Sequence, residues 1–233
     1  MKTIQCSFIV LFLLKLTPVY AESWYQVEII IFDRLNPDLS EESWNNEKPK
    51  IRPDMTELYP NFQTSIDQEF VPYMIMDEKN NRMNGVYRVL KLSRDYRPLV
   101  HFSWQQPATK RHESRYIHIF KNNAGKESSE IEKQESIIEP NFIEDFISNE
   151  KILDGSIRIR SDFYLHVDLN LYYFKNLFVD GEIYEKKTQS LDENFERLII
   201  GLKESRKIKL NEIHYFDNPM YGVILQVSRL GES

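Results

Sequence analysis

A histidine and an aspartate stand close together in an alternating segment of the chain, and this pairing could bind a metal ion. His166 and Asp168 are two residues apart, so in a strand their side chains share one face about 7 Å apart. With His214 or His101 from a neighbouring strand they would supply two imidazoles and a carboxylate, a ligand set typical of metal-dependent enzymes. The alternative is that all three are ordinary polar residues on a half-exposed sheet, because no HExxH motif accompanies them.

Other catalytic groups lack a supporting pattern. The chain contains no GxSxG turn and no GxGxxG or GxxxxGK[ST] loop, and Cys6 is its only cysteine. The carboxylate pair Glu144 and Asp145 falls in a charged, polar segment, whereas carboxylate catalysis requires a rigid cleft. We therefore expect a protein that is not an enzyme and that uses no cofactor.

Two short basic rows favour binding. In a strand, Arg158 and Arg160 point to the side opposite Ile157 and Ile159. The segment SRKIKL places Lys207 and Lys209 on one face in the same way. Such rows could hold the carboxylates of an anionic polymer. They could equally be the charges that keep an edge strand soluble.

Aromatic residues could complete such a binding surface by stacking on sugars. We expect Trp104, Tyr164 and Tyr215 to do so, and His166 joins them from the polar face of the strand that also carries Tyr164. Together with the two basic rows, these four residues form the predicted binding set.

The first 21 residues have the pattern of a signal peptide. Lys2 is followed by the apolar run Phe8–Leu14 and then by Val19 and Ala21 at the cleavage positions. Removing this leader takes away two lysines and no acid, so the mature chain has 28 basic and 36 acidic residues, a net charge of −8. An acidic, cysteine-free mature chain argues against binding to nucleic acid or anionic membranes and against stabilisation by disulfides. We expect no membrane span after cleavage at Ala21.

The remaining sequence predicts one domain, residues 22–233, with α+β architecture. A mainly antiparallel β-sheet would pack with one or two helices and carry long irregular insertions. The helix is expected to begin at Asn81 and to end before Pro98, with Met83, Val86, Tyr87 and Leu90 on its apolar face. The proline-rich residues 36–80 and the polar residues 121–150 are the insertions, the second with a short helix near 142–147. The predicted strands are 24–35, 98–107, 115–120, 155–174, 198–210 and 223–230; 98–107 and 115–120 would form a hairpin, and Asp180-Gly181 would be the tip of another.

Four segments, in order, resemble the CsiV family of periplasmic peptidoglycan-binding proteins of Gram-negative bacteria. They are WYQVEIIIFDRL, LVHFSWQQP, FYLHVDLNLYY and SRKIKLNEIHYFDNPMYGVILQV, within residues 22–230. Departures occur where the family tends toward W-R-Q-P and D-H-P. This chain has Gln105 in the first motif and Asn218 in the second, and its SRKIKL is richer in lysine than the family's strand.

The resemblance implies a non-enzymatic protein that binds peptidoglycan and supports cell-wall synthesis and cell shape. The implied protein partner is a lipoprotein activator of a bifunctional penicillin-binding protein. Two other hypotheses remain open. One is a metal-dependent periplasmic hydrolase using His166, Asp168 and His214. The other is a pure protein-interaction module that uses residues 36–80 and 121–150.

Overall fold

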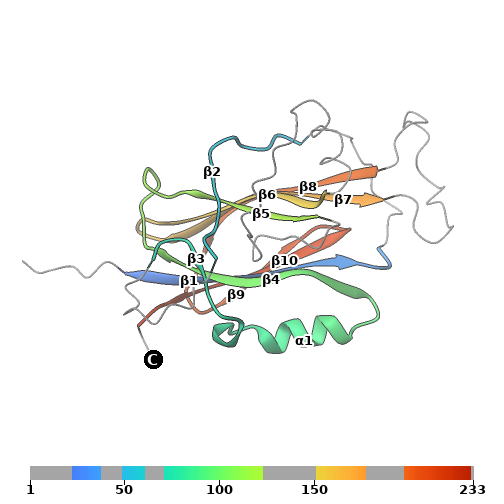
Figure 1. Cartoon of the computed structure of the whole chain (residues 1–233), viewed down its shortest axis with the longest axis horizontal. Helices are drawn as coiled ribbons and strands as arrows, with labels where there is room; N and C mark the ends of the chain where they lie inside the picture. Colours follow the sequence, from blue (N-terminus) through green and yellow to red (C-terminus); the bar gives the residue numbers. More distant parts are fainter. Residues whose placement is uncertain (1–22, 38–48, 61–70, 123–150, 177–196, 232–233) are drawn as a thin grey trace, which may run out of the picture.

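The computed structural model describes residues 23–37, 49–60, 71–122, 151–176 and 197–231. Two five-stranded sheets, A and B, face each other as a sandwich, and one helix lies on the outer side of sheet A (Figure 1).

Sheet A has the order β3 (Met74–Ile75), β4 (Tyr96–Pro107), β1 (Trp24–Arg34), β10 (Tyr221–Arg229) and β9 (Ile213–Asp217). Sheet B has the order β2 (Met55–Thr56), β5 (Tyr116–Asn122), β6 (Lys151–Ser161), β7 (Leu165–Asn176) and β8 (Arg197–Ile208). Neighbouring strands are antiparallel, apart from β2 and β5. The predicted mainly antiparallel α+β fold is confirmed.

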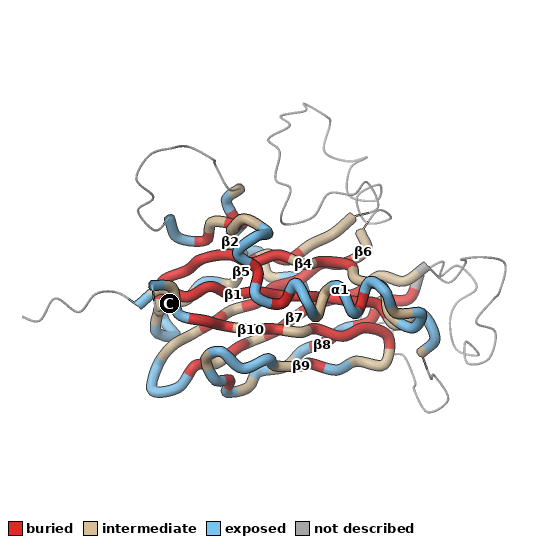
Figure 2. The backbone as a smooth tube through the Cα atoms, turned by 90° about the horizontal axis from the view of Figure 1, so that it is seen from below, coloured by how far each residue is buried: buried red, intermediate tan, exposed pale blue. Residues whose placement is uncertain are grey.

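The core lies between the two sheets and is built by period-two alternation. Val27, Ile29 and Ile31 of β1 are fully buried and face sheet B. From β7, Val167 and Leu171 are also fully buried. Figure 2 shows this burial running through the middle of the long strands. The alternating apolar residues therefore point inward, as predicted, and the residues between them lie on the outer face of each sheet.

The two open sides of the sandwich are closed differently. On one side Leu58 is only 1% exposed, between β2 of sheet B and the bridge from Tyr59 to Met74 of β3 in sheet A. On the other side Arg206 of β8 stacks on the Phe216 ring, 3.8 Å from its centroid, and donates a hydrogen bond to the Tyr215 carbonyl of β9. The described residues 57–60 of the segment predicted to be irregular therefore cover one side of the core.

Helix α1 (Asn84–Leu92) follows the 3-10 turn η1 (Glu78–Asn80) and packs on the outer face of sheet A. The apolar stripe expected from the sequence is confirmed, since all four of its residues pack in a small second core with Ile30 and Phe32 of β1. The helix is shorter than predicted and starts at Asn84. Before it, the backbone N–H groups of Arg82 and Met83 donate to the buried Glu28 carboxylate.

The predicted hairpin of residues 98–107 with 115–120 is wrong. β4 pairs with β1 in sheet A, and β5 pairs with β6 in sheet B, so the intervening turn carries the chain from one sheet to the other. The reason is burial, because β4 is buried on both faces whereas β5 has only one apolar face. The expected short helix near 142–147 and the expected tip at Asp180-Gly181 lie outside the described residues. Among the helices described, none is long and apolar enough to cross a membrane.

Candidate functional site

The outer face of sheet B gathers three of the four basic residues that the alternation predicted, Arg158, Arg160 and Lys207. Across β6, β7 and β8, Arg160 lies beside His166, and His166 beside Lys207. In the next row, Arg158 lies beside Asp168 and Asp168 beside Ser205. We call this surface the basic face, defined by Lys50, Arg52, Arg158, Arg160, Tyr164, His166, Lys203 and Lys207.

Asp168 orders the middle of the basic face. Its Oδ2 accepts hydrogen bonds from Arg158 (Nη2, 2.6 Å) and Arg160 (Nε, 3.2 Å), and its Oδ1 accepts one from the Ser205 hydroxyl. Burial alone would raise the pKa of Asp168, but hydrogen bonds from Ser205, Arg158 and Arg160 outweigh burial and lower it. The carboxylate is therefore ionised and fixes two guanidinium groups in place.

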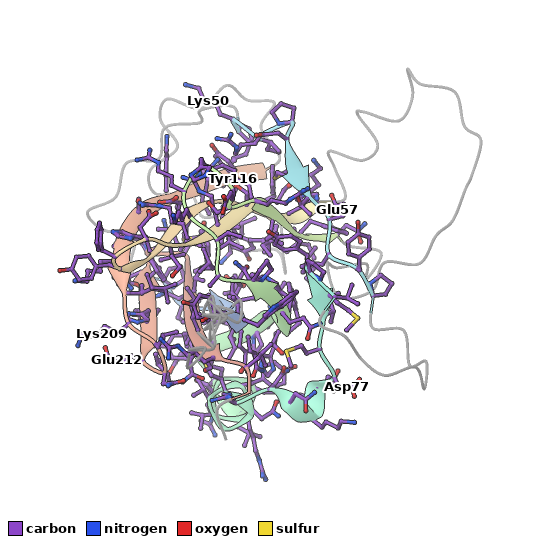
Figure 3. All side chains as sticks on the ribbon, turned by 90° about the vertical axis from the view of Figure 1, so that its left-hand side faces the viewer. Lys50, Glu57, Asp77, Tyr116, Lys209 and Glu212 are labelled. Carbon is purple, nitrogen blue, oxygen red and sulfur yellow. The ribbon has the colours of Figure 1, made fainter. Side chains whose placement is uncertain are left out.

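A tyrosine joins the arginines to the segment that crosses this sheet. The guanidinium carbons of Arg52 and Arg158 lie 3.8 and 4.2 Å from the centroid of the Tyr116 ring. The backbone N–H of Lys50 donates to the Tyr172 hydroxyl at 3.1 Å, which holds the segment on the sheet. Figure 3 places Lys50 and Tyr116 on the sheet B side, away from Asp77 beside the helix. Sequence reasoning missed Arg52 and Tyr116, because the first lies in the supposedly irregular segment and the second in the supposed β4 hairpin.

An exposed aromatic tip borders the basic face. Tyr164 is 57% exposed, and the Lys207 ammonium lies 2.9 Å from its ring centroid. The next residue toward the tip of the β6–β7 hairpin, Phe163, is 99% exposed. His166 is within hydrogen-bonding distance of the Tyr164 carbonyl through Nδ1 at 3.1 Å. An open aromatic pair beside ammonium and imidazole groups suits a ligand with both sugar rings and carboxylates.

The basic face has the opposite sign to the chain as a whole. It carries six lysine and arginine side chains against the carboxylates of Asp54, Asp162 and Asp168, whereas the whole chain has a net charge of −6. In the described parts of the chain, Lys203 and Lys207 have no carboxylate partner. These two exposed ammonium groups, one of which lies on the Tyr164 ring, are thus not neutralised by a carboxylate.

Five of the eight predicted binding residues come together here: Arg158, Arg160, Tyr164, His166 and Lys207. Trp104 is the clear correction, because it is fully buried between the sheets and cannot stack on a ligand. Tyr215 lies on sheet A, where it bonds with Arg34 and Asp217. Lys209 lies in the turn after β8 and forms a 3.0 Å ion pair with Glu212 (Figure 3).

The metal site considered from the sequence does not form. The Asp168 oxygens are taken up by arginine and serine donors. His166 contacts the Tyr164 carbonyl, and His214 contacts the Lys209 backbone. Within the described residues, no three His, Cys, Asp or Glu side chains converge as metal ligands.

A second charged cluster attaches β2 to sheet B. His118 lies between Glu57 (Oε1, 2.5 Å) and Asp154 (Oδ1, 2.8 Å), and Lys151 contacts the other oxygen of Asp154 at 2.6 Å. Burial alone would lower the pKa of His118, but hydrogen bonds with Asp154 and Glu57 raise it to about 9. The imidazolium therefore links Glu57, next to β2, to Asp154 of β6 by two charged hydrogen bonds. It was not predicted, because Glu57 and Asp154 come from two segments far from His118 in the sequence.

A β-sandwich with a basic, aromatic-flanked outer face has the features of a binding protein. Residues 4–230 match the family model described as "Peptidoglycan-binding protein, CsiV". The chain belongs to this CsiV family, which confirms the resemblance noted in the sequence and implies a place in the cell envelope. No curated protein and no solved structure matches the chain.

Proposed function

We propose that the protein is a non-enzymatic accessory factor of the periplasm that binds peptidoglycan through the basic face. Export would follow from the signal peptide predicted at residues 1–21. The observation that carries the proposal is the cluster of cations on sheet B in an otherwise acidic chain. Membership of a family described as peptidoglycan-binding supports peptidoglycan as the ligand.

The chemistry of the ligand fits this face. Peptidoglycan consists of glycan strands joined by short peptides that carry free carboxylates. The exposed ammonium groups of Lys203 and Lys207 would pair with those carboxylates, and Tyr164 with Phe163 would stack on the sugar rings. Arg158 and Arg160 already share Asp168, so they would contribute donors fixed in direction more than free charge.

The cellular role follows from the family resemblance. The protein would support wall synthesis and cell shape by helping a lipoprotein activator to switch on a bifunctional penicillin-binding protein. In this role it provides an attachment to the wall, with the chemistry left to the synthase.

A co-sedimentation experiment tests wall binding. Purified protein is mixed with isolated sacculi and pelleted at about 0.15 M salt, where exposed charges are screened beyond roughly 8 Å. We expect the wild type to pellet and the double variant Lys203→Glu/Lys207→Glu to bind about tenfold more weakly or worse, since two attractive contacts become repulsive. The matched control Arg88→Glu/Lys91→Glu makes the same charge change on the opposite side of the molecule and should pellet like the wild type. A wild type that stays in the supernatant would contradict the proposal.

A further inference from the structure

The outward side of helix α1 exposes apolar residues that the fold does not use. Val89 is 70% exposed and Leu92 is 75% exposed, and their spacing of three residues puts them on one face of the helix. The inward side is fully used, because Val86, Tyr87 and Leu90 pack on sheet A. Two aliphatic side chains are thus left in water next to each other.

Cations surround this apolar pair. Arg88 and Lys91 flank the two apolar residues along α1, and Arg94 lies two residues after the end of the helix. In the described residues none of the three forms an ion pair. Asp95 is the acidic residue of this stretch, so the helix end is basic in an acidic chain. We call the surface of Arg88, Val89, Lys91, Leu92 and Arg94 the helix face.

Residues of sheet A hold helix α1, and with it the helix face, in place. The Glu28 carboxylate is 1% exposed and accepts the N–H groups of Arg82 at 2.6 Å and Met83 at 2.9 Å, just before α1 begins. The same carboxylate contacts His101 Nε2 at 2.8 Å, and the Tyr87 ring stacks on His101 at 4.5 Å. A buried carboxylate at a helix N-terminus stabilises that end. The helix is therefore presented rigidly, which lowers the entropic cost of binding a partner.

A hollow adjoins the helix face. Its volume is about 410 Å³, and its lining includes Asn84, Tyr87 and Lys91 of the helix and Pro98 and His101 of β4. The Lys91 side chain thus borders both the hollow and the outer surface. An acidic side chain of a partner would find the Lys91 cation in the lining of the hollow.

We propose that the helix face and this hollow dock an acidic protein partner, one whose surface carries a small apolar spot ringed by carboxylates. Charge complementarity selects the class of partner. A membrane surface fits less well, because the larger apolar stripe of α1 is already buried on sheet A and two aliphatic residues offer little to insert. The inference rests on the proposed accessory role, which requires contact with a second protein. It does not depend on which surface of the molecule binds peptidoglycan.

The helix face and the basic face lie on opposite outer surfaces of the sandwich (Figure 1). α1 covers sheet A, whereas the basic face belongs to sheet B. One molecule can therefore hold the wall on one side and a protein on the other without competition between them.

Site-specific cross-linking tests the proposal. The photoreactive residue p-benzoylphenylalanine replaces Val89 in growing cells and, as a control, replaces Val71, an exposed aliphatic residue that precedes β3 and lies outside the helix. We expect a protein adduct at position 89 and none at 71, identified by mass spectrometry. Adding Arg88→Glu, Lys91→Glu and Arg94→Glu should remove the adduct. With the identified protein purified, the triple variant should bind it about tenfold more weakly or worse.

Three results would overturn the docking proposal: no protein adduct at position 89, an adduct that survives charge reversal, or flotation of the protein with phosphatidylethanolamine–phosphatidylglycerol vesicles that depends on the helix face. The sacculus experiment separates this from wall binding. The triple variant should still pellet with sacculi, whereas loss of pelleting would assign the helix face to the wall. Failure of the Lys203/Lys207 prediction alone would leave partner docking intact. Equal thermal unfolding of wild type and variant checks that these exposed changes leave the fold unaltered.

Discussion

The side chains of Arg158 and Asp168 meet across the β6–β7 pair, with Nη2 and Oδ2 2.6 Å apart. Both are mostly covered, at 12% and 16% side-chain exposure. The same carboxylate also receives Arg160. A residue that looked like a metal ligand in the sequence is thus the anchor of an arginine pair, and this explains how a basic surface can be ordered before any ligand arrives.

Replacing Asp168 with Asn should destabilise the protein although it removes a negative charge from an acidic chain. Hydrogen bonds from two guanidinium groups and one hydroxyl are weakened, so we expect a loss of about 2 kcal/mol in the free energy of unfolding, measured with urea. The control Asp162→Asn removes a longer, more exposed contact to Arg160, 3.8 Å away. It should cost less than about 0.5 kcal/mol. Equal effects of the two changes would show that Asp168 has no special anchoring role.

The His118 cluster predicts a loss of stability in alkali. The pKa of His118 is about 9 in the folded protein against 6.5 for the ordinary side chain. The imidazolium therefore contributes fully below about pH 6.5, and its contribution is lost as the pH rises through about 9, up to roughly 3 kcal/mol. Urea unfolding of wild type at pH 6 and pH 9.5 should show this drop.

The variant His118→Asn should unfold with much less difference between those two pH values. His112→Asn, at a side chain 72% exposed, serves as the control and should behave like the wild type. If the wild type and His118→Asn lose stability in parallel, the tie between β2 and sheet B does not depend on this imidazolium.

Replacing two glycines with alanine should change the stability of the protein in opposite directions. Gly155 of β6 has φ +152°, and a Cβ there would lie 2.2 Å from the Asn170 carbonyl oxygen of β7. Gly155→Ala should cost about 3 kcal/mol or more, from strain and from forced separation of the strands. Gly85 in α1 has nothing within 4 Å of such a Cβ, so Gly85→Ala should stabilise by up to about 1 kcal/mol. Thermal unfolding of both proteins measures this contrast, and a neutral Gly155→Ala would refute the close strand approach.

Removing the charge of Glu28 should loosen α1 selectively. Glu28→Gln keeps the shape but weakens the bonds to the Arg82 and Met83 N–H groups, for a loss of about 2 kcal/mol. Hydrogen exchange should then accelerate in α1 more than in the strands of sheet B, because the described contacts of the helix are with sheet A. Glu78→Gln, at an exposed position in η1, is the control and should exchange like the wild type. Uniform acceleration would mean that Glu28 supports the whole sandwich and has no specific role at the helix.

The sequence by itself determined which side chains share a face. Alternation put Val27, Ile29 and Ile31 on one side of their strand, and it put Arg158 and Arg160 on one side of theirs, because the pleat of a strand has a period of two in any context. The helical spacing from Met83 to Leu90 likewise marked the face that packs on sheet A. These are local properties of the backbone, so a local pattern suffices to read them.

Only the tertiary structure decided what covers each face. Trp104 looked available for stacking, yet it is buried, because β4 lies within sheet A with sheet B against one side and the helix region against the other. Arg52 and Tyr116 joined Arg158 only when the chain from 49 to 60 folded over sheet B. The division into two sheets, the contacts around Asp168 and the opposite placing of the basic and helix faces all depend on pairings between distant strands. Burial of whole surfaces selects those pairings, and no short stretch of sequence contains that information.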